Sequence, residues 1–385
     1  MEQPFLRSKK FIIGAITFAI LAGVLFVSIE VVRSGRKATE VTEVTKATEV
    51  SEATVVHIPL PDEVRGIYWT AVTAATKRAD ALIAYMLKSG LNTAVIDLKM
   101  DNGQIAFSPH DASLAPYVMK KPAIHNLDAL LAKLADDHIY RIARIVVMRD
   151  SAFASVQSKS AFRSSNGGLW RDKTGSLWLD PSSPDVALYA LALGREAYAR
   201  GFDEVQFDYV RFASDGSISS IRYPVYDGKQ LKVDVMKKFF ATVGELLQKE
   251  KIPVSFDVFG LTCMTNDGLG VGQRLTDILP NTDFISPMTY PSHYANGFQG
   301  FANPAMHPYD VVKISLDHGA KLLEVTEAAQ VIRKQFRPWI QDFDIGAVYT
   351  HDKIESEIKA TRDAGASGFL IWNARNVYEP ARYLK

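Results

Sequence analysis

Short apolar runs and amphipathic runs alternate along the chain from about residue 60 to its end. Eight runs are rich in β-branched and aromatic residues, as strands are: Val64–Thr70, Thr93–Lys99, Arg141–Arg149, Glu204–Phe212, Pro253–Phe259, Asp283–Tyr290, Phe336–Phe343 and Gly368–Asn373. Seven segments between them carry the apolar spacing of helices: Lys77–Lys88, Leu127–His138, Asp185–Arg200, Val233–Lys249, Val271–Leu279, Tyr309–Lys334 and Asp352–Ala364. Strands that alternate with helices pair in parallel through right-handed crossovers, and eight of them close into a barrel. The pattern therefore predicts an α/β protein with a (β/α)8 TIM barrel.

The main alternative is a doubly wound open sheet. Such a sheet would place a glycine-rich phosphate-binding turn after its first strand. The residues at that position are Tyr68, Trp69, Thr70 and Ala71, none of which is glycine. The chain has 385 residues, of which 47% are hydrophobic. A barrel of about 250 residues or more with an additional tail fits that length.

A long apolar run occupies the N-terminus. It covers residues 11–32, is broken only by Thr17, Ser28 and Glu30, and follows three basic residues. About 20 apolar residues are enough to span a bilayer, and basic residues before such a run are common to signal peptides and signal anchors. Because we find no convincing small-x-small cleavage site after the run, we predict one transmembrane helix that remains as a signal anchor. A cleaved signal peptide is the alternative.

The N-terminal run also predicts the domain organisation. Residues 1–37 would form a cytoplasmic tail and the transmembrane anchor. Residues 38–60 begin with a repeated Thr-Glu-Val pattern that lacks the large apolar groups of a core, so they are expected to be a linker. Residues 61–385 would then form the barrel domain, held at the cell membrane by a single span and lying outside the cytoplasm.

Charge and cysteine content exclude several classes of function. The net charge is +1 and no basic block lies within the barrel region, which argues against a nucleic-acid partner. Cys263 is the single cysteine, so neither a disulfide framework nor a cysteine-based zinc cluster can form within the chain. No His-Glu-x-x-His motif or calcium-binding loop occurs. We therefore predict no metal and no cofactor.

Two of the predicted strands contain a carboxylate among apolar residues near their carboxyl ends, Asp208 and Asp257. Burying a carboxylate among Val and Phe is unfavourable unless it is paired or used. Catalysis in TIM barrels takes place at the carboxyl ends of the strands, and glycoside cleavage ordinarily takes two carboxyl groups. We predict Asp208 as nucleophile or base and Asp257 as proton donor. The alternatives are a structural pair of Asp208 with Arg211, and a loop-ordering role for Asp257.

Other strand ends carry polar or aromatic side chains. Asp97 and Lys99 would share one face of their strand, where they either bind a sugar hydroxyl or hold the barrel mouth rigid. Flat aromatic faces suit pyranose rings, and the loop between Ser151 and Pro184 is polar enough to be interpreted as a substrate-binding loop. Trp339 is expected in the core and Trp69 is ambiguous. The predicted substrate-binding residues are Asp97, Lys99, Asp150, Trp170, Trp178, Arg211, Tyr290, His293, Gln341, Trp372 and Asn373.

Several of these motifs together resemble one known family. They are Val64–Tyr68, Val95–Lys99 with Asp101 and Gly103, Gly168–Trp170, Trp178–Pro181, Gly201–Phe212 and Ser286–Pro291. In these motifs the chain is similar to the glycosyl hydrolases of domain-of-unknown-function family 4015, from about residue 62 to the C-terminus. The resemblance implies a barrel related to carbohydrate hydrolases and does not imply a substrate.

A weaker resemblance connects the chain to the family 18 chitinases. Asp203 and Asp208 match the alternating acids of the fourth strand in that family, but Gln206 and Val210 stand where a further acid and the proton donor would be. This departure argues against the substrate-assisted chitinase mechanism and is compatible with a shared sugar-binding architecture.

The combined prediction is a glycoside hydrolase that cleaves a polysaccharide of the cell envelope or the surroundings. A polysaccharide deacetylase would need a metal-binding Asp-His-His set, which we do not find. The alternative from another class is a catalytically inactive barrel that binds glycan and serves as an envelope receptor or scaffold. The sugar, its linkage and the anomeric outcome remain open.

Overall fold

The computed structural model describes residues 55–324 and 329–378. The chain divides into two units, Met1–Ala53 and Thr54–Lys385, and the second contains all described residues. The predicted anchor and most of the predicted linker lie outside the described residues. Among the residues that are described, no helix combines the length and apolar character needed to cross a membrane.

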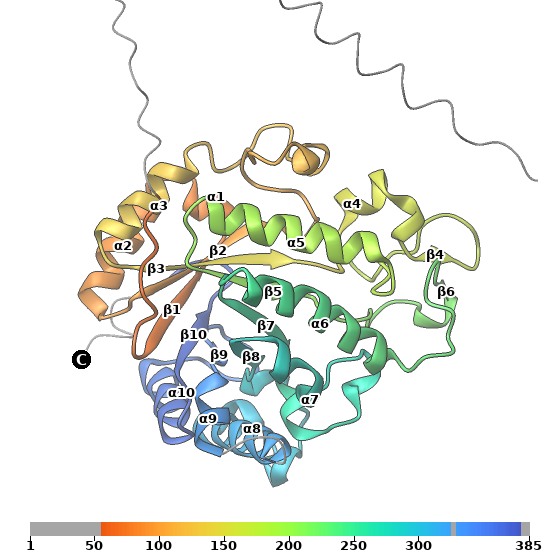
Figure 1. The fold of residues 1–385 in the computed structure, drawn as a ribbon. Coiled ribbons are helices and arrows are strands. Elements are labelled where there is room, and N and C mark those ends of the chain that lie inside the picture. Colours follow the sequence, from red (N-terminus) through yellow and green to blue (C-terminus); the bar gives the residue numbers. More distant parts are fainter. Residues whose placement is uncertain (1–54, 325–328, 379–385) are drawn as a thin grey trace, which may run out of the picture. The chain divides into compact units, whose positions relative to one another are not determined.

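Eight parallel strands close into a barrel, which confirms the predicted TIM barrel (Figure 1). The strands are β1 (Val64–Trp69), β2 (Thr93–Lys99), β3 (Tyr140–Val146), β5 (Glu204–Asp208), β7 (Val254–Phe259), β8 (Phe284–Met288), β9 (Trp339–Gln341) and β10 (Gly368–Trp372). Each strand pairs with the barrel strands that precede and follow it in the sequence, and β10 pairs with β1 to close the ring. Strands that enter and leave the barrel in sequence order bring all their carboxyl ends to one rim.

The main helices surround the barrel (Figure 1). They are α2 (Arg78–Ser89), α3 (Leu127–Asp136), α5 (Pro184–Ala199), α6 (Lys232–Lys249), α7 (Leu275–Ile278), α8 (Pro308–Leu323), α9 (Ala329–Gln335) and α10 (His351–Asp363). Short helices α1 (Ala71–Ala74) and α4 (Ser151–Val156) lie in the loops after β1 and β3. Local residue choice explains two helix boundaries. Pro184 is the first residue of α5, and Gly90 caps the C-terminus of α2 in the left-handed conformation at φ 67°.

Several predicted elements differ in extent from those observed, and three of them have a clear local difference. The predicted strand 336–343 is shorter, because Pro338 has no N–H to donate and the ladder is reduced to an isolated bridge between Phe336 and Ile285 before β9. The strand predicted to continue to Phe212 ends at Asp208, since Tyr209 has a left-handed backbone at φ 54°. The single helix predicted over 309–334 is two helices, α8 and α9.

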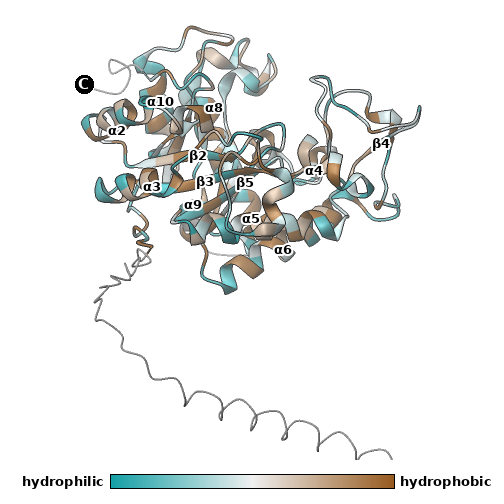
Figure 2. Ribbon diagram, turned by 90° about the horizontal axis from the view of Figure 1, so that it is seen from above, coloured by the Kyte–Doolittle hydropathy of each residue, from teal (hydrophilic) through white to brown (hydrophobic). Residues whose placement is uncertain are grey.

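The barrel has two hydrophobic cores. The larger one lies between the strands and the surrounding helices. The smaller one lies inside the barrel and consists of Val64, Tyr68, Val95, Tyr140, Ile142, Tyr290, Trp339 and Leu370. The strands are accordingly hydrophobic while the outer helices carry both kinds of residue (Figure 2). A small antiparallel pair, β4 (Arg163–Ser164) with β6 (Ile221–Arg222), projects to one side in both views.

A buried ion pair occupies the barrel interior near the amino ends of the strands. Arg337 donates to Glu204, and both side chains have no solvent exposure. Ser255 Oγ donates to Glu204 Oε1 at 2.6 Å, and Tyr140 OH donates to Glu204 Oε2 at 3.3 Å. This end of the barrel is therefore filled by protein, which leaves the opposite rim for chemistry.

Candidate active site

The two predicted catalytic carboxyls lie at the same level on adjacent strands. The β5–β7 ladder aligns Phe207 with Phe256, so the residues that follow, Asp208 and Asp257, reach the carboxyl ends together. Strand alternation turns both side chains into the barrel. A cavity of about 170 Å³ opens there, and its lining residues are Asp101, Arg144, Asp208, Tyr209, Arg211, Phe259, Met288, Tyr290, Trp339 and Trp372.

Arg144 on β3 connects three carboxylates at this mouth. Its Nη2 lies 2.5 Å from Asp208 Oδ2, its Nη1 lies 2.5 Å from Asp97 Oδ1, and its Nε lies 4.0 Å from Asp257 Oδ2. Burial disfavours its charge, but the carboxylates of Asp97 and Asp208 raise the pKa of Arg144 well above its usual value. Arg144 is the main site residue that the sequence reasoning missed. The sequence did contain a signal for Arg144: a basic residue in the middle of an apolar strand is as unusual as the acids Asp208 and Asp257 are in theirs.

Asp208 accepts hydrogen bonds on both oxygens. Arg144 donates to Oδ2, and the backbone N–H of Tyr209 donates to Oδ1 at 2.6 Å. The left-handed backbone of Tyr209 is uncommon for a residue with a side chain, and such strain is concentrated at functional sites. The alternative in which Asp208 pairs with Arg211 is not observed, because the partner of Asp208 is Arg144.

Asp257 has a different environment. It is only 1% exposed and does not line the cavity. Its Oδ1 accepts a hydrogen bond from Trp339 Nε1 at 2.8 Å, while its Oδ2 has no hydrogen-bond partner among the described residues. Burial, followed by the negative charge of Asp208, raises the pKa of Asp257 well above its usual range. Asp257 therefore retains its proton at pH values where an ordinary aspartic acid is ionised.

Asp97 is held in an aromatic and ionic network at the mouth. Tyr68 OH donates to its Oδ2 and Arg144 donates to its Oδ1. The Tyr68 ring stacks on Trp372 at 4.0 Å, and the Arg144 guanidinium lies 5.2 Å from the centre of the Trp372 ring. Because both carboxylate oxygens of Asp97 already accept hydrogen bonds from protein side chains, these contacts favour a role in holding the barrel mouth rigid over direct binding of a sugar. Trp372 remains partly exposed and lines the cavity.

Lys99 and Asp150 form a buried ion pair away from the cavity. Lys99 Nζ lies 2.8 Å from Asp150 Oδ2, and neither side chain is exposed. Asp150 also accepts a hydrogen bond from the backbone N–H of Phe153, which caps α4. A register irregularity between Asp97 and Lys99 interrupts the alternation that was expected to place both side chains on one face of β2. Their predicted contact with substrate is thus replaced by a structural role.

The loop between Ser151 and Pro184 packs apolar side chains into the larger hydrophobic core, so the expectation that it is too polar to pack is wrong. Trp170 and Trp178 are 2% and 1% exposed and present no open face for sugar stacking. Trp170 Nε1 donates to the Ser217 carbonyl at 3.1 Å, and Trp178 Nε1 donates to Asp172 Oδ2 at 2.9 Å. The polar residues of the loop surround an apolar interior that the composition alone concealed.

Three further predicted residues lie around the rim. Gln341 is buried, accepts a hydrogen bond from the Ser292 N–H at 3.1 Å and donates to the Phe343 carbonyl at 2.9 Å. Asn373 is buried and donates to Asp342 Oδ2 at 3.2 Å. Both side chains therefore order the rim loops. His293 is exposed, with its ring 5.3 Å from that of Tyr290.

Of the predicted substrate-binding residues, Arg211, Tyr290 and Trp372 line the cavity beside Asp208. Tyr209, Phe259 and Met288 line it without having been predicted. Trp339, expected in the core, both belongs to the interior cluster and reaches the cavity wall. No group of three or more His, Cys, Asp or Glu side chains suitable for a metal ion occurs among residues 55–324 and 329–378.

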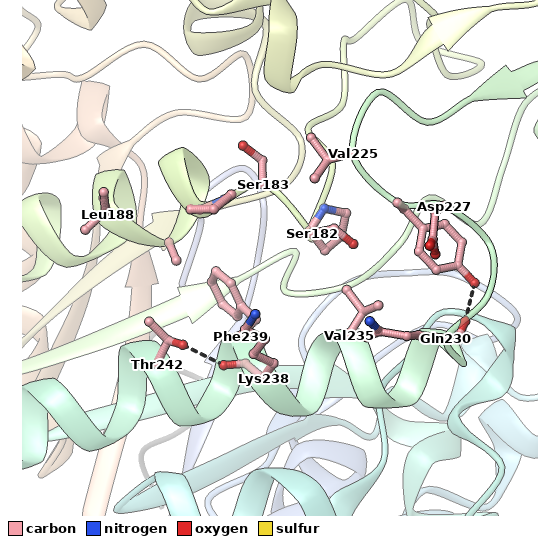
Figure 3. Close-up of a pocket in the computed structure, with 14 residues that line it drawn as sticks. Ser182, Ser183, Leu188, Val225, Asp227, Gln230, Val235, Lys238, Phe239 and Thr242 are labelled. Atoms are coloured by element: carbon pink, nitrogen blue, oxygen red, sulfur yellow. Dashed lines mark hydrogen bonds between the residues drawn. The ribbon is translucent and has the colours of Figure 1, made fainter. Parts of the chain in front are cut away.

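A second, larger groove of about 510 Å³ lies on the flank between α5 and α6 (Figure 3). Figure 3 shows Leu188 on α5 and Phe239 and Thr242 on α6 facing it, with Val225 and Asp227 from the loop that follows β6. None of the predicted site residues lines this groove.

A closed parallel barrel with carboxyl groups at its carboxyl-terminal rim is an architecture that glycoside hydrolases use. Residues 66–378 match the model of domain-of-unknown-function family 4015, described as "Putative glycosyl hydrolase domain", and the chain belongs to this family. The resemblance and the predicted enzyme class are thereby confirmed. No match is found among curated proteins.

Several solved structures are similar to this chain. The glycoside hydrolase domain of PgaB (BpsB) from Bordetella bronchiseptica is 12% identical, with 81% of this chain and 94% of that chain covered and a TM-score of 0.60. A hypothetical protein from Ruminiclostridium thermocellum ATCC 27405 is 29% identical, with 50% and 97% covered and a TM-score of 0.45. The glycoside hydrolase domain of PelA from Pseudomonas aeruginosa is 12% identical, with 84% and 97% covered and a TM-score of 0.45. The PgaB likeness supports the fold.

Proposed function

We propose that this protein hydrolyses glycosidic bonds of a cell-envelope or extracellular polysaccharide, with Asp208 and Asp257 as the carboxyl pair. The observation that carries the proposal is the contrast between two carboxyls at one level of adjacent strands. Asp208 faces the cavity and accepts hydrogen bonds from a cation and an amide, whereas Asp257 is buried beside it with a raised pKa. Paired acids in unlike environments are the arrangement that separates a base or nucleophile from a proton donor.

In the proposed mechanism Asp208 attacks the anomeric carbon or activates a water molecule, and Asp257 protonates the departing oxygen. Arg144 and the Tyr209 N–H fix the orientation of the Asp208 carboxylate. For direct proton transfer, the departing oxygen must reach the space beside the unpartnered Asp257 Oδ2. The Trp339 indole, which donates to Asp257 Oδ1, would hold the carboxyl in place.

The test measures the release of reducing ends from a panel of envelope glycans. Asp208→Asn and Asp257→Asn are each expected to lower the release by about 100-fold or more, since a positioned acid or base contributes about 10²–10⁴ in rate. Asp136→Asn, an exposed acid on α3, is the matched control and should retain full activity. Binding of a glycan without release by the parent and by all three variants would favour the alternative of a receptor or scaffold.

Activity is also expected to depend on pH through Asp257. If Asp257 donates the proton, activity falls as pH rises through its elevated pKa. The same group affects stability: because its pKa is raised in the folded state, its contribution is complete below the unfolded pKa of about 4 and is lost as pH rises through the folded value. Denaturant midpoints measured from pH 4 to pH 9 should therefore fall with a shallower slope in Asp257→Asn than in the parent. Identical slopes would show that Asp257 does not hold its proton.

We also propose that residues 1–37 anchor the barrel to the cell membrane, that residues 38–60 act as a linker, and that the barrel acts outside the cytoplasm. A tethered hydrolase would act on glycan close to its own membrane. The apolar run over residues 11–32 supports this proposal. Retention of the full chain in membranes after alkaline washing is the expected result, and release into the wash would contradict it.

A further inference from the structure

Among the described residues, Arg211 differs from the other buried arginines because it has no carboxylate partner. Four arginines in the described part of the chain are more than nine-tenths buried. Three have carboxylate partners: Arg141 with Asp203, Arg144 with Asp97 and Asp208, and Arg337 with Glu204. No carboxylate of the described residues lies within 4.0 Å of the Arg211 guanidinium, although Arg211 is only 7% exposed. It lines the same cavity as Asp208.

Aromatic rings surround the Arg211 guanidinium. Its central carbon lies 4.9 Å from the centre of the Trp178 ring, 5.1 Å from that of Tyr209 and 4.5 Å from that of Phe259. These rings desolvate the charge, and burial lowers the pKa of Arg211. Cation–π contact compensates part of that loss but does not use the N–H groups.

The protein uses only part of the hydrogen-bonding capacity of Arg211. Nη1 donates to the Phe212 carbonyl and to Ser214 Oγ, each at 3.1 Å. Nε and Nη2 make no hydrogen bond to the described residues. Guanidinium carries five N–H donors in a fixed planar fork, and one edge of that fork binds a carboxylate or phosphate through two parallel hydrogen bonds. A buried, unpaired cation is unfavourable by itself, so such a group at a cavity wall is suited to an anion that arrives with the ligand.

We propose that Arg211 binds an anionic group carried by the substrate, so that the glycan cleaved at this site is acidic. The proposal rests on the hydrolase function proposed above and adds a substrate class to it. Carboxylate, phosphate and sulfate share the chemistry that Arg211 recognises. Arg144 is less suited to this role, because the carboxylates of Asp97 and Asp208 already balance its charge and accept hydrogen bonds from its Nε, Nη1 and Nη2.

The experiment measures equilibrium binding to matched pairs of oligosaccharides. Oligogalacturonides are compared with the same oligosaccharides after chemical reduction of their carboxyl groups to neutral hydroxymethyl groups. Phosphorylated and sulfated oligosaccharides, each beside its unmodified form, distinguish the source of the charge. Because hydrogen bonds to charged groups are the stronger class, we expect the preferred anionic member to bind about 10- to 100-fold more tightly than its neutral partner.

Arg211→Gln should abolish this preference, and Arg211→Lys should retain part of it, since lysine keeps the charge without the planar fork. Arg171→Gln, at an exposed arginine of the loop between Ser151 and Pro184, is the control and should bind as the parent does. The parent's preference itself requires no variant, so the test holds even if Arg211→Gln folds poorly. Equal binding within every pair, absence of binding to all anionic members, or an unchanged preference in a folded Arg211→Gln would overturn the proposal.

The measurements separate this proposal from the proposed hydrolysis. Preference for anionic glycans without any release of reducing ends would refute the hydrolase activity and leave the role of Arg211 intact. Release of reducing ends from the neutral oligosaccharides alone would support the hydrolase activity and refute the proposed role of Arg211.

Discussion

Replacing Arg144 with methionine is expected to lower both the activity and the stability of the protein. The substitution leaves Asp97 and Asp208 buried without their shared cation, and removing one partner of a buried ion pair destabilises by about 3–5 kcal/mol. It also frees the Asp208 carboxylate from its orientation, so the release of reducing ends should fall by at least about 100-fold. Denaturant unfolding and the reducing-end assay measure the two effects separately.

A set of variants distinguishes positioning by Arg144 from a purely structural role. Arg144→Lys should be more stable than Arg144→Met but should have little activity. The reason is that a lysine ammonium cannot hold Asp208 and Asp97 in the fixed geometry that the planar guanidinium provides. Adding Asp97→Asn to Arg144→Met removes one unpaired carboxylate and should recover stability without recovering activity. Arg163→Met, at an exposed arginine, is the control. If activity returned in proportion to stability, Arg144 would act only on folding.

Replacing Arg337 with methionine is expected to destabilise the barrel by about 3–5 kcal/mol without changing the activity of the folded fraction. Glu204 would lose its cation in a part of the interior with no solvent exposure, although Ser255 and Tyr140 would still donate to it. The pair lies near the amino ends of the strands, remote from the catalytic rim. Urea unfolding midpoints give the loss of stability.

The double variant Arg337→Met with Glu204→Leu tests the origin of this effect. Replacing both charges by apolar groups of similar size is often neutral or stabilising, so most of the loss should disappear. A double variant as unstable as Arg337→Met alone would show that packing of Arg337 on the Phe284 ring, 4.2 Å from its guanidinium, carries the stability.

The periodicity of the sequence predicted the barrel because strand and helix patterns are local. The eight barrel strands all lie within or close to the predicted runs. Two of the larger errors in extent lie where the local backbone ends the ladder, at Tyr209 and Pro338. The acids at the strand ends could also be predicted, since a charge within an apolar run is visible without knowledge of its neighbours. Their positions at one level of the rim then followed from the parallel register.

Several site assignments could not be predicted, because they depend on partners that only the closed barrel brings together. Lys99 was expected to share one face of its strand with Asp97, but the register shifts between them and Lys99 pairs with Asp150. Trp170 and Trp178 were expected to be open to substrate, but their loop folds over them. Nothing in the sequence showed that Arg144, and not Arg211, would pair with Asp208.

By itself, the sequence determined the number and order of the strands and the presence of acids at their ends, because both follow from side-chain alternation within one segment. The tertiary structure decided which of those charges pair and which remain available to a ligand. The physical reason is that pairing depends on distances of a few ångströms across different strands, set by closure of the barrel and by burial. The raised pKa of Asp257 and the Arg211 guanidinium, which has no carboxylate within 4.0 Å among the described residues, are consequences of that closure.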